Sequence, residues 1–289
     1  SALILSLLPL SLLVEQIVSF VLIGTIGLMH GATDHVLFMN YRKEKQQKGI
    51  PKSFFVMYLT VLALMMAIWF IFPPLAIGLF ILASCYHFGQ TQLQYLPFSE
   101  SHRGKKTLYL VWGALVIMAI VMINSEESAQ LLSSLIDKEL TRAIFDYRWP
   151  ILAFLLGAYL ALSISLRIKQ LFPYLFIEII ELAVIGMIAR HSSLLLSFAL
   201  FFGLWHSLRA AQVQIDKLAE TASFRFKDFI VKSLPFTGIS IMGIALLLWI
   251  ATYFDLSIEP FMLILIAISI LTMPHMIIYE KFYGFHDHH

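Results

Sequence analysis

The sequence predicts an all-α, polytopic transmembrane helix bundle of about nine spans, with the N-terminus outside the cell and the C-terminus in the cytoplasm. Three observations predict this class: a very apolar composition, a series of apolar stretches of membrane-spanning length, and an alternating distribution of basic residues. We expect residues 1–289 to form a single transmembrane helical domain, because neither an internal repeat nor a long linker divides them.

Composition excludes several classes of protein. Of the 289 residues, 60% are hydrophobic and 13% are charged, whereas soluble domains contain roughly 45–50% apolar and about 25% charged residues. This excess of apolar residues excludes a soluble globular domain. The single cysteine, Cys85, excludes a disulfide scaffold, and a net charge of only +2 does not indicate nucleic-acid binding.

Apolar stretches of about 20 residues can each cross the roughly 30 Å hydrocarbon core of a bilayer as a helix. The stretches that reach this length are residues 14–40, 53–72, 75–96, 107–124, 149–166, 172–189, 193–213, 233–253 and 259–280. Residues 1–13 are too short to span separately, so we expect an interfacial or truncated prefix there. We expect an extracytoplasmic loop with a short amphipathic helix at 125–148, and a flexible tail at 284–289.

Basic residues alternate from loop to loop. Sixteen of the 20 lysines and arginines fall in the loops 41–52, 97–106, 167–171 and 209–232 and in the C-terminal segment. The remaining four fall in the intervening loops. Because short loops rich in basic residues stay in the cytoplasm, this pattern predicts the stated orientation and a multi-pass protein of the plasma (inner) membrane.

Four histidines lie inside predicted spans, at one predicted depth. His30, His87, His206 and His275 all fall in the inner half of the bilayer if the orientation is as predicted. A titratable group at membrane depth costs about 2.5–3.5 kcal/mol on insertion scales, so each one needs a partner or a function. A single buried histidine is often only a packing residue, but four in one layer predict a common metal site.

Carboxylates accompany this histidine layer. Asp34 follows His30 by four residues and so shares its helix face, where it can fix the tautomer of a metal-bound imidazole or simply satisfy a buried ring. Glu178 and Glu181 return to the same layer on the sixth span, as partners of histidine or as proton carriers. His35 is a further candidate ligand, with plain packing as the alternative.

The residue types alone do not identify the metal. Several imidazoles without a thiolate suit iron, copper or zinc. The 24 phenylalanines and 12 methionines suit a long apolar cavity for a lipid-like substrate, although the same residues fill any membrane bundle.

Four sequence blocks around these histidines form a recognisable pattern: HGATDH at 30–35, SCYHFG at 84–89, FFGLWHSLR at 201–209 and MPH at 273–275. The pattern resembles the Brp/Blh family of bacterial and archaeal membrane proteins, β-carotene 15,15'-dioxygenases. The resemblance implies cleavage of the central double bond of β-carotene into two retinal molecules, with Fe(II) as cofactor and dioxygen as co-substrate. It also implies the lipid bilayer, β-carotene, retinal and a microbial rhodopsin as partners, and no nucleic acid.

The resemblance further implies that His30, His87 and His206 are iron ligands. The family pattern has a second histidine one turn after the one at His206, and this chain has Ala210 at that position. His275 or His35 would therefore complete the ligand set. The carboxylates of the layer, Asp34, Glu178 and Glu181, would then be catalytic residues that orient the imidazoles.

Two other functions remain open from the residues. A transporter or channel could use the buried histidines and glutamates as an ion or proton path, although no inverted repeat is visible. A catalytically inactive homologue that binds carotenoid or retinal is the other alternative, and it is suggested by Ala210.

Overall fold

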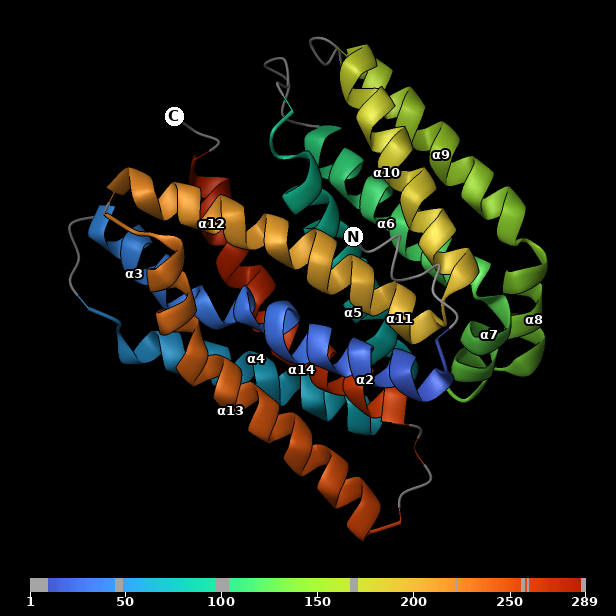
Figure 1. Ribbon diagram of the computed structural model, residues 1–289, viewed down its shortest axis with the longest axis horizontal. Coiled ribbons are helices and arrows are strands. Elements are labelled where there is room, and N and C mark those ends of the chain that lie inside the picture. Colours follow the sequence, from blue (N-terminus) through green and yellow to red (C-terminus); the bar gives the residue numbers. More distant parts are fainter. Residues whose placement is uncertain are drawn as a thin grey trace. The chain divides into compact units, whose positions relative to one another are not determined.

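The computed structural model describes residues 10–44, 49–96, 104–166, 171–221, 223–255, 258 and 260–286. Across these ranges every regular element is helical and there is no strand (Figure 1). In chain order the elements are α2 Leu12–Leu22, η1 Ile23–Gly27, η2 Gly31–Thr33, α3 Asp34–Glu44, α4 Lys52–Ile71, α5 Pro73–Leu93, α6 Lys105–Ile123, α7 Ser125–Ser133, α8 Lys138–Asp146, α9 Arg148–Ser165, α10 Leu171–His191, α11 Leu194–Ala199, η4 Leu200–Ser207, α12 Leu208–Thr221, α13 Phe226–Tyr253 and α14 Pro260–His286.

Eight helices of the described chain are long and apolar enough to cross a membrane, and each overlaps one of the predicted stretches. The remaining stretch corresponds to α5, which has 21 residues but is made less apolar by the polar segment from His87 to Gln92. An all-helical, multi-pass membrane protein is therefore confirmed. The count of nine spans and the orientation stay predictions.

The segments outside the spans differ in detail from the prediction. Loop 125–148 contains two short helices, α7 and α8, instead of one. The break comes where Asp137 accepts hydrogen bonds from the backbone N–H groups of Glu139 and Leu140, at 2.8 and 3.1 Å, and so caps a new helix. At the C-terminus, α14 continues to His286, inside the predicted tail, while 287–289 lie outside the described residues, as do 1–9 of the predicted prefix.

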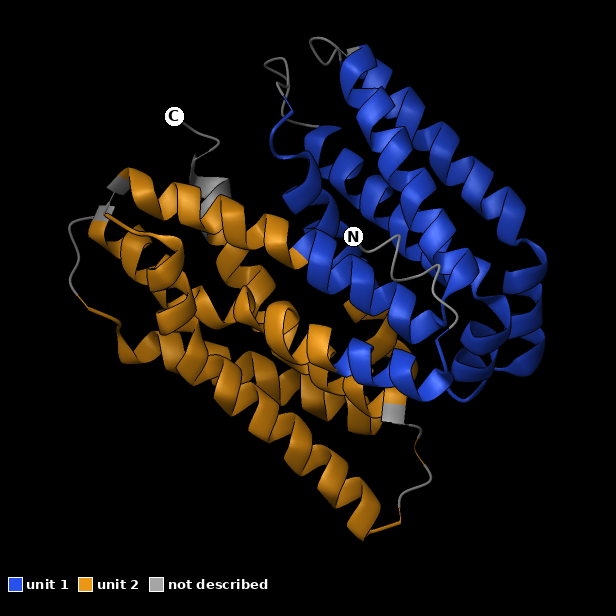
Figure 2. Cartoon of the chain, viewed as in Figure 1, with its two compact units in different colours: residues 1–20, 81–206 blue, residues 21–80, 207–289 orange. Residues whose placement is uncertain are grey.

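Two compact units divide the chain (Figure 2). Unit 1 comprises residues 1–20 and 81–206, and unit 2 comprises residues 21–80 and 207–289. The boundaries fall within the residue ranges of α2, α5 and η4. The expectation of a single domain stays a prediction.

Each unit has its own packing. In unit 1, α6 packs against α9, α10 and α11 (Figure 1). In unit 2, α14 packs against α3, α4 and α13. The buried apolar cluster of unit 2 consists of Val36, Leu37, Phe54, Ala211, Leu218, Phe224, Phe229 and Ile278.

Candidate metal centre

His87 lies on α5, in the segment where the backbones of α5 and α6 approach each other closely. A Cβ atom added to Gly113 of α6 would lie 1.8 Å from the carbonyl oxygen of Cys85, and one added to Gly89 of α5 would lie 1.8 Å from the carbonyl oxygen of Tyr109. Membrane helices use small residues in this way to approach closely. The two glycines therefore hold the segment of α5 that contains His87 tightly against α6.

Replacing Gly113 by alanine is expected to lower the thermal unfolding temperature clearly, because the new methyl group would force the two helix backbones apart. Overpacking of this kind costs about 1–3 kcal/mol or more. Thermal unfolding in detergent measures the effect. Gly157→Ala on α9 is the matched control, since no heavy atom lies within 4 Å of its added Cβ. Equal unfolding temperatures for the two variants would contradict this packing.

His206 lies in η4, a π-helical segment that continues from α11. Two carboxylates fix the start of α11: Glu15 accepts a hydrogen bond from the N–H of Ser193 at 3.0 Å, and Glu127 accepts one from the N–H of Leu194 at 2.9 Å. These bonds satisfy N–H groups that a helix start leaves without intrahelical partners. The π-helical segment is notable because π-bulges occur frequently at functional sites.

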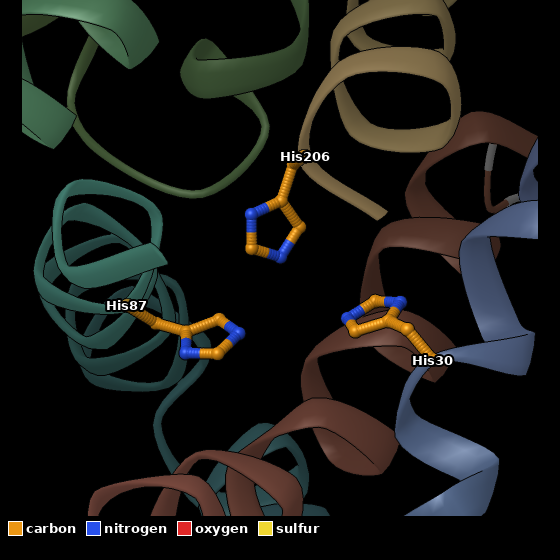
Figure 3. A group of neighbouring side chains, drawn as sticks. All are labelled: His30, His87 and His206. Atoms are coloured by element: carbon orange, nitrogen blue, oxygen red, sulfur yellow. The ribbon is translucent and has the colours of Figure 1, made fainter. Parts of the chain in front are cut away.

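His87 and His206 form a buried pair in unit 1. Their ring centroids are 4.9 Å apart with the rings 74° to each other, and one nitrogen of each ring lies within 4.8 Å of the other. The side chains are only 2% and 3% exposed. Figure 3 shows the two rings approaching each other from different helices, and it also draws His30. Two ring nitrogens this close in a dry site can serve as ligands of one metal ion.

Phenylalanines surround this pair in unit 1. The ring of Phe88 lies 4.4 Å from that of His206, and Phe202 stacks on His206 at 6.0 Å with only 18° between the planes. Phe201 and Phe198 extend the group through contacts with Phe88 and Phe202. The sequence interpretation did not single out these rings. Their signal was the spacing of Phe198, Phe202 and His206, which follow one another at intervals of four residues.

A second buried pair, His30 and His275, lies in unit 2. The ring centroids are 5.0 Å apart and nearly perpendicular, at 87°. Asp34 Oδ1 lies 2.6 Å from Nδ1 of His275, and Tyr58 donates a hydrogen bond to Asp34 Oδ2 at 3.2 Å. An ionised carboxylate only accepts hydrogen bonds, so this contact suits a neutral His275 that donates from Nδ1 and keeps the lone pair of Nε2 for a metal. This is how a carboxylate prepares a histidine for metal binding.

Asp34 contacts a different histidine from the one that its position in the sequence indicated. The sequence paired Asp34 with His30, four residues earlier on one helix face, but its carboxylate is bonded to His275 on α14 instead. The physical reason is local helix geometry. Between His30 and Asp34 the backbone forms the 3₁₀ turn η2, so the uniform 3.6-residue period used to align the two side chains does not hold there.

His35 packs its ring against Phe236 of α13, with the centroids 4.6 Å apart. This contact favours the packing alternative that the sequence left open. A ligand role for His35 stays a prediction.

Glu178 and Glu181 belong to a hydrogen-bonded group of unit 1. The Nε2 atom of Gln92 donates to both carboxylates, and Tyr95 donates to Glu178 at 2.8 Å. Glu178 is fully buried, at 0% exposure. Gln92 follows His87 by five residues on α5, so the donor of this group lies on the same helix as one member of the histidine pair. That the glutamates orient imidazoles stays a prediction, and the sequence interpretation missed Gln92 and Tyr95.

The chain is similar to one known protein family over most of its length. A family model described as Beta-carotene 15,15'-dioxygenase matches residues 21–283. The chain belongs to this family. No curated protein and no solved structure matches the sequence.

The Beta-carotene 15,15'-dioxygenase family implies a metal cofactor, and the chemistry of the buried donors fits one. The donors are imidazoles, and one of them, that of His275, is bonded to a carboxylate; imidazole ligands suit Fe, Cu and Zn. The only thiol of the chain, Cys85, is two residues from His87 and therefore points to a different side of α5. Membership of the family thus supports a carotenoid dioxygenase-like function for this chain.

Proposed function

We propose that this chain is a non-haem iron dioxygenase that cleaves the central double bond of β-carotene to give two molecules of retinal. The observation that carries the proposal is the buried pair His87–His206 among phenylalanine rings, in a chain of this family. A polyene dissolved in lipid reaches such a site without entering water, which gives the membrane location a physical reason. The plasma (inner) membrane is the expected compartment, and a rhodopsin as the acceptor of retinal stays a prediction.

Four histidines are the proposed ligands of one Fe(II): His30, His87, His206 and His275. Their common depth, predicted from the sequence, and the two buried pairs support this assignment. Fe(II), when bound, supplies the activation of dioxygen for attack on the double bond. His275 is the proposed replacement for the histidine that the family pattern has at position 210, because Asp34 contacts its Nδ1 and leaves Nε2 facing away from the carboxylate.

The surrounding side chains have roles in binding and orientation. Phe88 and Phe202 exclude water from the pair and offer flat apolar faces to a conjugated chain. Asp34 fixes the tautomer of His275, and Tyr58 fixes Asp34. We propose that Glu178 and Glu181, held through Gln92, fix the cytoplasmic half of α5 and hence the direction of His87.

Product analysis tests the proposal. Purified protein in detergent is loaded with Fe(II) without oxygen, then mixed with β-carotene in micelles and exposed to air. We expect retinal in chromatography with mass detection, at two molecules for each β-carotene consumed. Protein loaded with Zn²⁺, which has no redox chemistry, is the matched control and is expected to form none.

The outcomes separate the alternatives. Iron-loaded protein that binds β-carotene and forms no retinal would overturn the dioxygenase and favour an inactive carotenoid-binding homologue. Protein that binds neither iron nor β-carotene would overturn it in favour of a transport function.

A further inference from the structure

His30 lies where the first long helix changes its hydrogen-bonding pattern. The π-helical η1 precedes it and the 3₁₀ turn η2 follows it. The N–H of Asp34 bonds to the carbonyl of Gly31, three residues earlier. In a regular α-helix this N–H would bond to the carbonyl of His30. The turn therefore releases the His30 carbonyl from its helical bond with Asp34.

In hydrocarbon, a carbonyl at an irregular turn is stabilised by a further donor, because no water is present to bond it. Gln214 of α12 provides one: its Nε2 donates to the His30 carbonyl at 3.2 Å. Thr33 Oγ1 lies 2.9 Å from the same carbonyl and 2.7 Å from Gln214 Oε1. Both side chains are completely buried, at 0% exposure.

The three groups form a chain of two hydrogen bonds with a defined direction, from Thr33 to Gln214 and from Gln214 to the His30 carbonyl. The His30 carbonyl can only accept, so the amide of Gln214 must turn its NH₂ toward it. Its Oε1 then faces Thr33, whose single hydroxyl proton goes to this oxygen in the shorter of its two contacts. This arrangement needs a side chain that has both a donor and an acceptor at one end, which a glutamine provides and a methionine of similar size does not.

We propose that Gln214, with Thr33, is a positioning residue for His30: it fixes the peptide of His30 and thereby the direction in which the imidazole meets the metal. The inference rests on the proposed function, in which His30 is an iron ligand. Metal ligands must be held within about 0.5 Å of the productive geometry by packing and hydrogen bonds. At a turn where the helical hydrogen bonding is irregular, a buried side chain bonded to the peptide can add this precision.

The test is iron binding by Gln214→Met, a substitution that keeps the length of the side chain and removes both hydrogen bonds. We expect an about 10–100-fold weaker affinity for Fe(II), the usual effect of losing a group that supports a ligand. In samples fully loaded with iron, the electron paramagnetic resonance spectrum of the nitric oxide adduct is expected to change, because this spectrum follows the ligand geometry.

Matched variants separate positioning from general packing. Gln212→Met on the same helix removes an exposed glutamine bonded to Asp216 and is expected to match the wild type. Thr33→Ser keeps the hydroxyl and is expected to retain the affinity, whereas Thr33→Val removes it and is expected to weaken binding.

Two different failures are distinguishable. Gln214→Met with the affinity and the nitric oxide spectrum of the wild type would overturn the inference, even if its unfolding temperature falls, and would leave the proposed function standing. Wild-type protein that binds no Fe(II) would overturn the proposed function and this inference with it.

Discussion

Replacing His206 by alanine is expected to abolish retinal formation while the chain remains folded in the membrane. His206 contacts the rings of Phe88 and Phe202, and it offers a ring nitrogen within 4.8 Å of one from His87. Loss of a group that only supports a ligand reduces metal affinity or activity by about 10–100-fold. Loss of the ligand itself is therefore expected to lower turnover by more than about 100-fold.

Two companion variants make this result specific. His206→Phe restores a ring against Phe88 and Phe202 without a nitrogen, and it is expected to be as inactive as the alanine variant. His191→Ala removes an exposed histidine at the end of α10 in the same unit, and it is expected to keep full turnover. Retinal formation by His206→Phe at a tenth of the wild-type rate or more would remove His206 from the ligand set.

Replacing Asp34 by asparagine is expected to weaken Fe(II) binding by about 10–100-fold. The asparagine oxygen can still accept from Nδ1 of His275, but it lacks the negative charge that makes the imidazole a better ligand. Titration of the purified protein with Fe(II) under nitrogen measures this change. Asp216→Asn on α12 is the control, because Asp216 is exposed and bonded only to its own helix in the contact with Gln212.

The same titration with Fe(II) applies to the variant His275→Ala. It is expected to weaken Fe(II) binding more than Asp34→Asn, because it removes the nitrogen that Asp34 prepares. Unchanged Fe(II) binding in His275→Ala would mean that His275 is not a ligand and does not replace the histidine absent at Ala210.

The long helices of this protein could be predicted because long apolar stretches mark them in the sequence. Each apolar stretch found in the sequence overlaps a helix, since a chain in hydrocarbon must satisfy its backbone within the helix itself. The histidines could be singled out for the same reason, because ionisable groups are rare at membrane depth.

Contacts across long sequence distances could not be predicted in this way. Asp34 and His275 are 241 residues apart, and Thr33 and Gln214 are 181 apart, so no local spacing joins them. The irregular turns η1, η2 and η4 also carry no hydropathy signal, because a π or 3₁₀ turn uses the same apolar residues as an α-helix. The predicted pairing of Asp34 with His30 was wrong because such a turn, η2, lies between the two residues.

The most direct test of the account is the number of iron atoms bound to each chain, measured by elemental analysis after loading with Fe(II) and removal of excess metal. Both histidine pairs belong to one proposed site, so we expect one iron in the wild type and loss of that iron in His206→Ala and, separately, in His30→Ala. Iron that persists when either histidine is removed, or two irons in each wild-type chain, would contradict it.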